Sequence, residues 1–266
     1  NTLDYMLYRN MQQKIIDVLD TAEYVEVIGK GENQTNMQVQ LAALSNPEKQ
    51  TKFENCVADV NIPLGEVFTS PKLAGTNGIL NVGTVYIGDI QYRNLRMEFK
   101  DGRVVSAVCD NFVENGVIDQ EAGHRLIVQG IMNGHEMLPL GEFAIGTNTT
   151  AYVMAEQYGI AGKLPILIAE KMGPHFAMGD TCYAWAEDSP MYNPDGKEVI
   201  ARENEVSAKR KEDPSKAYFG CHTDITIPYR ELQSVAVEKA DGTTIPLIED
   251  GRFVLPGTEE LNEPFG

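Results

Sequence analysis

The sequence predicts an α+β fold in which most strands form an antiparallel sheet and a few helices flank it. The first observation is a succession of strand patterns from Gly75 to Val108, in which Asp101-Gly102 is a dipeptide typical of a β-hairpin turn. The second observation is that helical spacing of apolar residues is clear only in Leu3–Ala22 and Gln120–Asn133. Strand patterns therefore dominate the chain.

The remaining elements follow from local patterns bounded by turn-forming residues. Residues 152–158 and 166–172 are expected to be helical or of mixed short structure. Residues 187–215 are polar and contain three prolines, which predicts an exposed excursion from a single catalytic-type domain covering residues 1–266. The expected strands are 23–28, 37–41, 78–82, 84–87, 95–99, 103–108, 140–145, 234–238, 243–248 and 252–255.

Composition limits the classes of function. The chain of 266 residues is 42% apolar and 23% charged, as in soluble globular proteins, and contains no apolar run long enough to span a membrane. Its net charge of −17 disfavours nucleic acid and anionic membranes and favours cations, although the same charge can serve solubility alone. The four cysteines form no CxxC pair, so we expect free thiols in a reducing cytoplasm rather than a zinc knuckle or disulfides.

Two segments place metal-ligand side chains in a defined context. His222 and Asp224 are two residues apart at the start of a strand-like run, so both side chains are expected on one face of that strand. Glu66 stands in a Pro/Gly-bounded turn that leads into an apolar strand. Imidazole and carboxylate on one face can hold a divalent cation. The alternative interpretation is a surface histidine with ordinary strand-edge carboxylates.

Two further residues stand in apolar surroundings. His175 is flanked by small and apolar residues between Gly173 and Gly179, which predicts a buried position or the floor of a cleft. Glu142 lies inside an apolar strand pattern, where a carboxylate needs a partner such as a metal. A hydrogen-bonded core histidine and a carboxylate turned to solvent remain the alternatives.

Other catalytic motifs are absent from the sequence. His124 and His135 belong to polar stretches and are expected to face solvent. The HExxH motif is not formed because Pro139 stands where its second histidine would be. No GxSxG elbow occurs, so the sequence gives no support for a serine hydrolase of that type.

The candidate ligands lie in four short segments, which are Asn61–Pro71, Leu140–Ala144, Glu170–Gly179 and His222–Asp224. Together these segments resemble the thermophilic metallo-aminopeptidase family, which includes aminopeptidase T and aminopeptidase S. Asn61–Pro71 differs at two of eleven positions from the family signature Asn-Ile-Pro-Asp-Gly-Glu-Val-Phe-Thr-Ala-Pro. The other three segments are similar to the family patterns Leu-Gly-Glu-Val-Ala, Glu-Asn-Ala-Ala-Cys-His-Ile-Ala-Leu-Gly and His-x-Asp.

The resemblance implies the catalytic half of such an enzyme, without the family's amino-terminal domain, and a metal site at a cleft. It implies two divalent ions (Zn, Co, Mn or Mg) that activate a water, with Glu142 bridging and Tyr183 donating to the oxyanion. The implied substrate is a peptide with a free amino terminus, and the implied setting is a cytoplasmic homodimer. The implied metal ligands are Glu66, Glu142, Glu170, His175, His222 and Asp224, with Glu66 and Glu142 also in catalytic roles.

Two other functions remain open at this stage. The chain can be a family member that keeps the fold as a binding or structural module without activity. It can also be a metal-dependent hydrolase of another amide, because a ligand set fixes the chemistry better than the substrate. Metal content after reconstitution separates the module from the enzymes.

Overall fold

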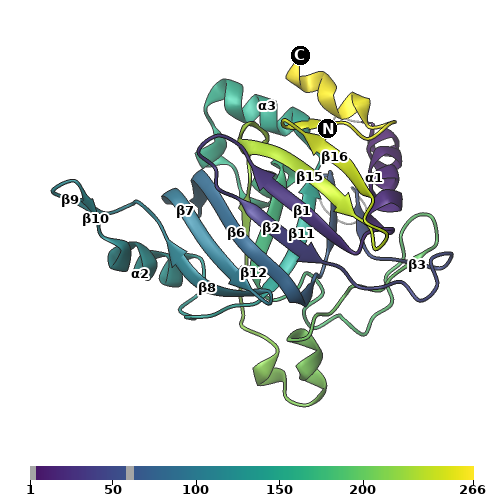
Figure 1. Cartoon of the computed structure of the whole chain (residues 1–266), viewed down its shortest axis with the longest axis horizontal. Helices are drawn as coiled ribbons and strands as arrows, with labels where there is room; N and C mark the ends of the chain where they lie inside the picture. Colours follow the sequence, from purple (N-terminus) through teal and green to yellow (C-terminus); the bar gives the residue numbers. More distant parts are fainter. Residues whose placement is uncertain (1–3, 58–62) are drawn as a thin grey trace.

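The protein is built around two antiparallel sheets, as Figure 1 shows. A computed structural model describes residues 4–57 and 63–266. Within each of these two sheets, neighbouring strands pair antiparallel. The only parallel ladder among the described residues joins two short strands, β3 (Gln50–Thr51) and β13 (Glu198–Val199). The predicted α+β class with a mostly antiparallel sheet is confirmed.

The larger sheet has eight strands in the order β17-β16-β15-β1-β2-β6-β7-β8. Its hairpin at Asp101-Gly102 joins β7 to β8 as predicted, with both turn residues at positive φ. Its strands are β1 (Tyr24–Gly29), β2 (Asn36–Gln40), β6 (Lys72–Ile87), β7 (Ile90–Lys100), β8 (Arg103–Val108), β15 (Leu232–Glu238), β16 (Thr244–Glu249) and β17 (Arg252–Phe253).

The smaller sheet has five strands in the order β14-β12-β11-β5-β4. Neighbours in this order lie far apart in the sequence, so the sheet brings together distant segments of the chain. The strands are β4 (Glu54–Cys56), β5 (Glu66–Thr69), β11 (Leu140–Gly146), β12 (Pro174–Gly179) and β14 (His222–Thr226). A separate short hairpin consists of β9 (Val113–Glu114) and β10 (Val117–Ile118).

One continuous apolar core joins the two sheets. In Figure 1, β11 and β12 lie behind β1, β2 and β6 of the larger sheet. Fully buried side chains from both sheets belong to the same cluster, for example Val27 and Leu80 from the larger sheet and Phe143 and Phe176 from the smaller one. β11 and β12 are buried along their whole length, which explains why they read as apolar runs rather than alternating patterns.

Helix α1 (Tyr5–Leu19) covers one side of this core. Asp4 caps it, since its carboxylate accepts hydrogen bonds from the backbone N–H groups of Met6 and Leu7 at 3.0 and 3.2 Å. Its apolar face is buried at helical spacing through Ile15 and Leu19. The other helices are α2 (Gln120–Gly130), α3 (Thr149–Tyr158), α4 (Ile166–Ala169) and the 3₁₀ turns η1 (Ala161–Lys163), η2 (Glu170–Met172), η3 (Ser207–Lys211), η4 (Pro214–Lys216), η5 (Tyr229–Glu231) and η6 (Glu259–Phe265).

The structure corrects two expectations about the strands. The two strands predicted on either side of Gly83 form one strand, β6. The ladder to β7 keeps its register from Val82 to Thr84, and the Gly83 N–H donates to Glu231 at 3.0 Å. The strand β12 around His175 was not predicted, because its Gly-Pro start and uniformly apolar sequence give no alternation. Asn61 and Ile62 of the first family segment lie outside the described residues.

Residues 187–215, expected to form an exposed excursion, have mixed burial. Residues 188–192 are exposed, but Val199, Ala201 and Val206 are buried. Backbone bonds attach the segment to the domain, for example from the N–H of Ser70 to the carbonyl of Ala201 at 3.1 Å. The apolar residues within the polar stretch are therefore anchors for this segment.

A buried glutamine connects α1 to the smaller sheet. The amide of Gln12 donates to Asn55 Oδ1 at 2.7 Å and to the Cys56 carbonyl at 3.1 Å, and its oxygen accepts from Thr147 Oγ1 at 2.8 Å. These bonds tie the helix to β4 and to the residue that follows β11.

We expect Gln12→Met to lower the free energy of unfolding by about 2–3 kcal/mol, because the methionine fills similar space and leaves buried polar partners unsatisfied. Chemical denaturation measures the change. The exposed Gln38 of β2 is the matched control, and Gln38→Met should stay within about 0.5 kcal/mol of wild type. Equal effects of the two substitutions would contradict a structural role for the Gln12 contacts.

Candidate metal centre

Adjacent strands of the smaller sheet bring five of the predicted site residues together. Glu66 opens β5, Glu142 lies in β11, His175 in β12, and His222 with Asp224 in β14. The strands are direct neighbours in the order β14-β12-β11-β5, with Ala144 opposite His175 and Ala177 opposite Asp224. The prediction that His222 and Asp224 begin a strand is confirmed.

His175 lies between three carboxylates. Its Nε2 atom is 3.4 Å from Glu66 Oε2, 3.4 Å from Glu142 Oε1 and 4.0 Å from Asp224 Oδ1. His175 is fully buried, and each of the three carboxylate residues is at most 4% exposed. The group is therefore a desolvated cluster of opposite and like charges.

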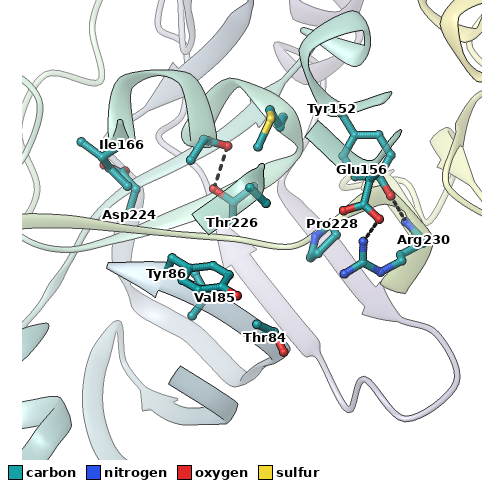
Figure 2. A pocket seen from close by; sticks show the side chains of 13 residues that line it. Thr84, Val85, Tyr86, Tyr152, Glu156, Ile166, Asp224, Thr226, Pro228 and Arg230 are labelled. Atoms are coloured by element: carbon teal, nitrogen blue, oxygen red, sulfur yellow. Dashed lines mark hydrogen bonds and ion pairs between the residues drawn. The ribbon is translucent and has the colours of Figure 1, made fainter. Parts of the chain in front are cut away.

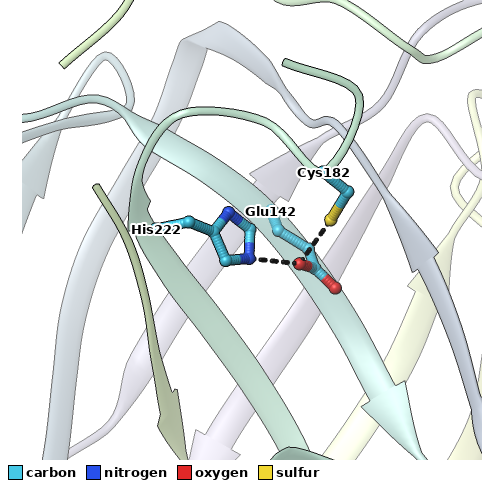
Figure 3. Close-up of side chains that lie close together, drawn as sticks. All are labelled: Glu142, Cys182 and His222. Carbon is cyan, nitrogen blue, oxygen red and sulfur yellow. Dashed lines mark hydrogen bonds and ion pairs between the residues drawn. The ribbon is translucent and has the colours of Figure 1, made fainter. Parts of the chain in front are cut away.

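His222 also approaches Glu142, at the carboxylate oxygen that does not face His175. Its Nε2 atom is 3.0 Å from Glu142 Oε2 and 3.5 Å from Asp224 Oδ1. The thiol of Cys182 also donates to Glu142 Oε2, at 2.6 Å, and Figure 3 shows the imidazole and the thiol converging on that oxygen. Glu142 is thus central: one oxygen faces His175 and the other faces His222 and Cys182.

Backbone carbonyls orient both imidazoles. The Nδ1 atom of His175 is 3.2 Å from the Gly173 carbonyl, and Nδ1 of His222 is 2.7 Å from the Asp180 carbonyl. A carbonyl can only accept, so each Nδ1 carries the proton and each Nε2 is directed at the cluster, as in histidines that bind metals. Gly141 permits this arrangement, because a Cβ there would lie 2.1 Å from the same Asp180 carbonyl.

A buried lysine completes the cluster. The ammonium of Lys171 donates to Glu66 Oε1 at 2.5 Å and forms a second ion pair with Glu170. Lys171 is 0% exposed, so its charge is held by these two carboxylates without water. Glu66 therefore has one oxygen on the lysine and the other, Oε2, facing His175.

The carboxylates and imidazoles shift one another's pKa values. Burial opposes ionisation of Glu142, but His175 and His222 outweigh it and hold the pKa of Glu142 below its ordinary value. Burial also opposes the charged form of His175, yet Glu142 and Glu66 raise the pKa of His175 well above its usual range. Burial raises the pKa of Glu170 to about 7 in spite of Lys171. The carboxylates of the cluster therefore stabilise positive charge at its centre.

These residues fit a divalent cation. Among the described residues, Glu66 Oε2, His175 Nε2 and Asp224 Oδ1 are buried without a hydrogen-bond partner. The 3.4 Å separations are long for hydrogen bonds but match the roughly 3.4 Å between ligand atoms of a tetrahedral ion with bonds of about 2.0–2.2 Å. Two sets of three residues each have ligand atoms that all lie within 4.8 Å of one another, and Glu142 belongs to both sets. They are Glu66, Glu142 and His175, and Glu142, Cys182 and His222.

The sequence model of the family described as thermophilic metalloprotease (M29) matches residues 6–253. The chain belongs to this family. The resemblance inferred from the four segments is thereby confirmed, and the metal expected in the family agrees with the donor set of the cluster. A search of curated proteins found no match.

Two solved structures are similar to this member of the family. Wild-type AmpT from Thermus thermophilus has a TM-score of 0.59 at 18% identity, over 94% of this chain and 55% of that chain. A 2,5-dihydroxypyridine dioxygenase from Pseudomonas putida KT2440 has a TM-score of 0.56 at 14% identity, over 95% of this chain and 61% of that chain. The chain spans little more than half of either protein, and such identities show a shared fold.

Two of the roles implied by the resemblance, those of Tyr183 and Glu170, are not supported by the geometry. Tyr183 is buried, and its hydroxyl donates a hydrogen bond to Glu54. The side chain from this turn that reaches Glu142 is Cys182, one residue earlier. Glu170 binds Lys171 and is in neither set of ligand atoms. The proposed roles of Tyr183 as oxyanion donor and of Glu170 as ligand therefore do not follow from their positions.

Sequence reasoning missed Cys182 and Lys171. The sequence analysis treats Cys182 only as one of four free thiols, although Cys182 directly precedes Tyr183, for which the family resemblance implies a role. Lys171 replaces the asparagine of the family segment, and a lysine in an otherwise apolar stretch signals a buried ion pair. His124 and His135, expected to face solvent, are half-buried and bind the carbonyls of Ala107 and Phe219 away from the cluster.

No helix in the described part of the chain combines the length and the apolar character that crossing a bilayer requires.

We expect Lys171→Met to lower the free energy of unfolding of the metal-free protein by about 3–5 kcal/mol, because Glu66 and Glu170 lose the charge that compensates them. Urea denaturation in chelator measures the change. Lys100 of β7 is exposed, and Lys100→Met serves as the control with an expected effect below about 0.5 kcal/mol. A loss below about 1 kcal/mol for Lys171→Met would show that the ion pairs are not structural.

Proposed function

We propose that the chain is a metal-dependent aminopeptidase that removes amino-terminal residues from peptides. The observation that carries this proposal is the pair of overlapping ligand sets that share Glu142, in a member of a metalloprotease family. The resemblance to metallo-aminopeptidases supports the exopeptidase activity. It also supports a cytoplasmic homodimer as the setting.

A divalent ion in such a site supplies Lewis-acid polarisation of the scissile carbonyl and lowers the pKa of a water. Glu66, Glu142 and His175 would hold one ion, and Glu142, Cys182 and His222 would hold a second. Asp224, whose Oδ1 is buried without a partner among the described residues, lies beside both histidines and can join either set. We propose two ions, of Zn, Co, Mn or Mg, because these donors suit several metals.

The chain's own groups supply the proton transfer and the selection of the substrate. We propose Glu170 as the carboxylate that accepts a proton from water, because Lys171 holds it beside Glu66, burial raises its pKa to about 7, and its side chain belongs to neither ligand set. Lys171 fixes the orientation of Glu170 and of Glu66. The free ammonium of a peptide is a cation, and the acidic cluster in a chain of net charge −17 complements it.

We expect Glu142→Ala to abolish hydrolysis of aminoacyl-p-nitroanilides by protein loaded with Zn²⁺, Co²⁺ or Mn²⁺, with a loss of at least about 1,000-fold in kcat. Both ligand sets lose their shared carboxylate in this variant. Release of p-nitroaniline measures the rate. Glu98 is an exposed strand glutamate, and Glu98→Ala should retain wild-type activity.

Three outcomes would contradict the proposal. Undiminished hydrolysis by Glu142→Ala would remove this cluster from the reaction. Equal hydrolysis of N-acetylated and free substrates by the wild type would exclude aminopeptidase specificity and favour a hydrolase of another amide. Failure to bind metal on reconstitution would favour the inactive module.

A second candidate function rests on a specific grouping in the cluster. His175 and His222 both approach Asp224 Oδ1, at 4.0 and 3.5 Å, which is the residue composition of the two-histidine, one-carboxylate sites of non-haem iron oxygenases. The similar dioxygenase from Pseudomonas putida shows that this fold also occurs in an oxygenase. Oxygen uptake by Fe²⁺-loaded protein with a dihydroxypyridine, and none with peptides, would favour this function over the aminopeptidase.

A further inference from the structure

A cavity of about 100 Å³ begins at the metal-ligand cluster. Asp224 belongs to both, since it faces His175 and His222 and also lines the cavity. In Figure 2, Asp224 and Ile166 lie on one side of the cavity, Arg230 and Glu156 lie on the other, and Thr226 and Pro228 lie between them. We call this space the side-chain cavity.

The walls of the side-chain cavity are mostly hydrocarbon. Val85 and the ring of Tyr86 come from β6 of the larger sheet, Ile166 from α4, and Met172 from η2 beside the smaller sheet. The cavity therefore lies between the two sheets, where the helical segment after α3 covers it. Ile166 is 40% exposed, so this residue stands at the rim.

Several polar groups of the cavity wall, from Thr226, Tyr152 and the Arg230–Glu156 ion pair, already have partners. Thr226 Oγ1 donates to the Ala169 carbonyl at 3.3 Å. The hydroxyl of Tyr152 accepts from the Arg230 N–H at 3.2 Å, and the Arg230 guanidinium is ion-paired with Glu156. A charged or strongly polar guest would lose its hydration without gaining these groups as partners. Of the residues that line the cavity, Asp224 alone, at the cluster end, keeps a buried oxygen without a hydrogen-bond partner in the described part of the chain.

We propose that the side-chain cavity receives the side chain of the substrate's amino-terminal residue and selects an aliphatic side chain of the size of leucine. This inference rests on the proposed aminopeptidase function. The reacting carbonyl belongs to the amino-terminal residue, whose side chain starts two bonds away from it. A cavity that begins at a ligand residue is within reach of that side chain, while the acidic cluster holds the ammonium of the same residue.

The cavity volume limits the size of the substrate side chain that can bind. An engineered protein cavity of about 150 Å³ accepts benzene. A cavity of about 100 Å³ therefore suits an isobutyl group and is too small for an indole. An alanyl side chain leaves most of the space unfilled, and each missing methylene in an apolar pocket costs about tenfold or more in specificity.

The test compares kcat/KM of the metal-loaded full chain for leucyl-, alanyl-, tryptophanyl- and glutamyl-p-nitroanilide. We expect the leucyl substrate to be preferred over each of the others by at least about tenfold. Ala161 lines the cavity, and Ala161→Phe should lower the leucyl value by about tenfold while the alanyl value stays within about twofold. Ala42 is a similarly half-buried alanine outside the cavity, and Ala42→Phe should preserve the leucyl preference.

Ile166→Trp provides a second variant in case Ala161→Phe does not fold. A residue at the rim tolerates a larger side chain, and the indole should obstruct the entrance with the same selective loss of the leucyl substrate. Equal losses for leucyl and alanyl substrates in this variant, or no loss in either, would overturn the assignment of the cavity.

Binding of L-leucinol and L-alaninol, measured by calorimetry on metal-loaded protein, separates this inference from the proposed function. These amino alcohols carry the ammonium and the side chain but no scissile bond. Tighter binding of leucinol by about tenfold or more, lost in Ala161→Phe, supports the cavity even if no anilide is hydrolysed, in which case the aminopeptidase function fails alone. Hydrolysis without any leucyl preference, together with equal binding of the two alcohols, overturns the cavity and leaves the aminopeptidase function in place.

Discussion

The structure depends on the mutual compensation of charges that are buried together. Four carboxylates, Glu66, Glu142, Glu170 and Asp224, are each less than 10% exposed, and Lys171 is the lysine that pairs with two of them. An isolated carboxylate in such surroundings would become neutral or draw in water. Here the imidazoles of His175 and His222 and the ammonium of Lys171 supply part of the positive charge, and a divalent cation held by the ligand sets would supply the rest.

The order of the strands in the smaller sheet brings these charged side chains together. Four neighbouring strands each contribute ligand residues, and their antiparallel ladders fix the spacing of the side chains on one face. The carbonyls of Gly173 and Asp180 then fix the orientation of the two imidazoles. A rigid sheet with apolar walls on its other side gives the cluster a geometry that a loop would not hold.

Much of this arrangement could be predicted from the sequence, because local patterns carried it. The spacing of His222 and Asp224 placed both on one strand face, and the lone Glu142 in an apolar run indicated a carboxylate with a partner. The hairpin at Asp101-Gly102 and the amphipathic helix α1 followed from turn chemistry and periodicity. The metalloprotease family could be identified from short segments because the candidate metal-ligand residues are concentrated in them.

The remaining features depend on contacts that no local pattern records. Tyr183 and Cys182 are neighbours in the sequence, and only the turn geometry decides which of them reaches Glu142 and which reaches Glu54. Lys171 shows its role only when Glu66, over 100 positions away, is brought beside it. Gly83 looked like a strand end because its partner Glu231 is distant in sequence.

The most direct test of the account is an anomalous-difference map from crystals of the chain soaked in Co²⁺ or Zn²⁺ and measured at the absorption edge of the metal. The account predicts a strong peak within bonding distance of Glu66 Oε2, Glu142 and His175 Nε2. A map with no peak in this cluster, and with His175 hydrogen-bonded to the carboxylates instead, would contradict it.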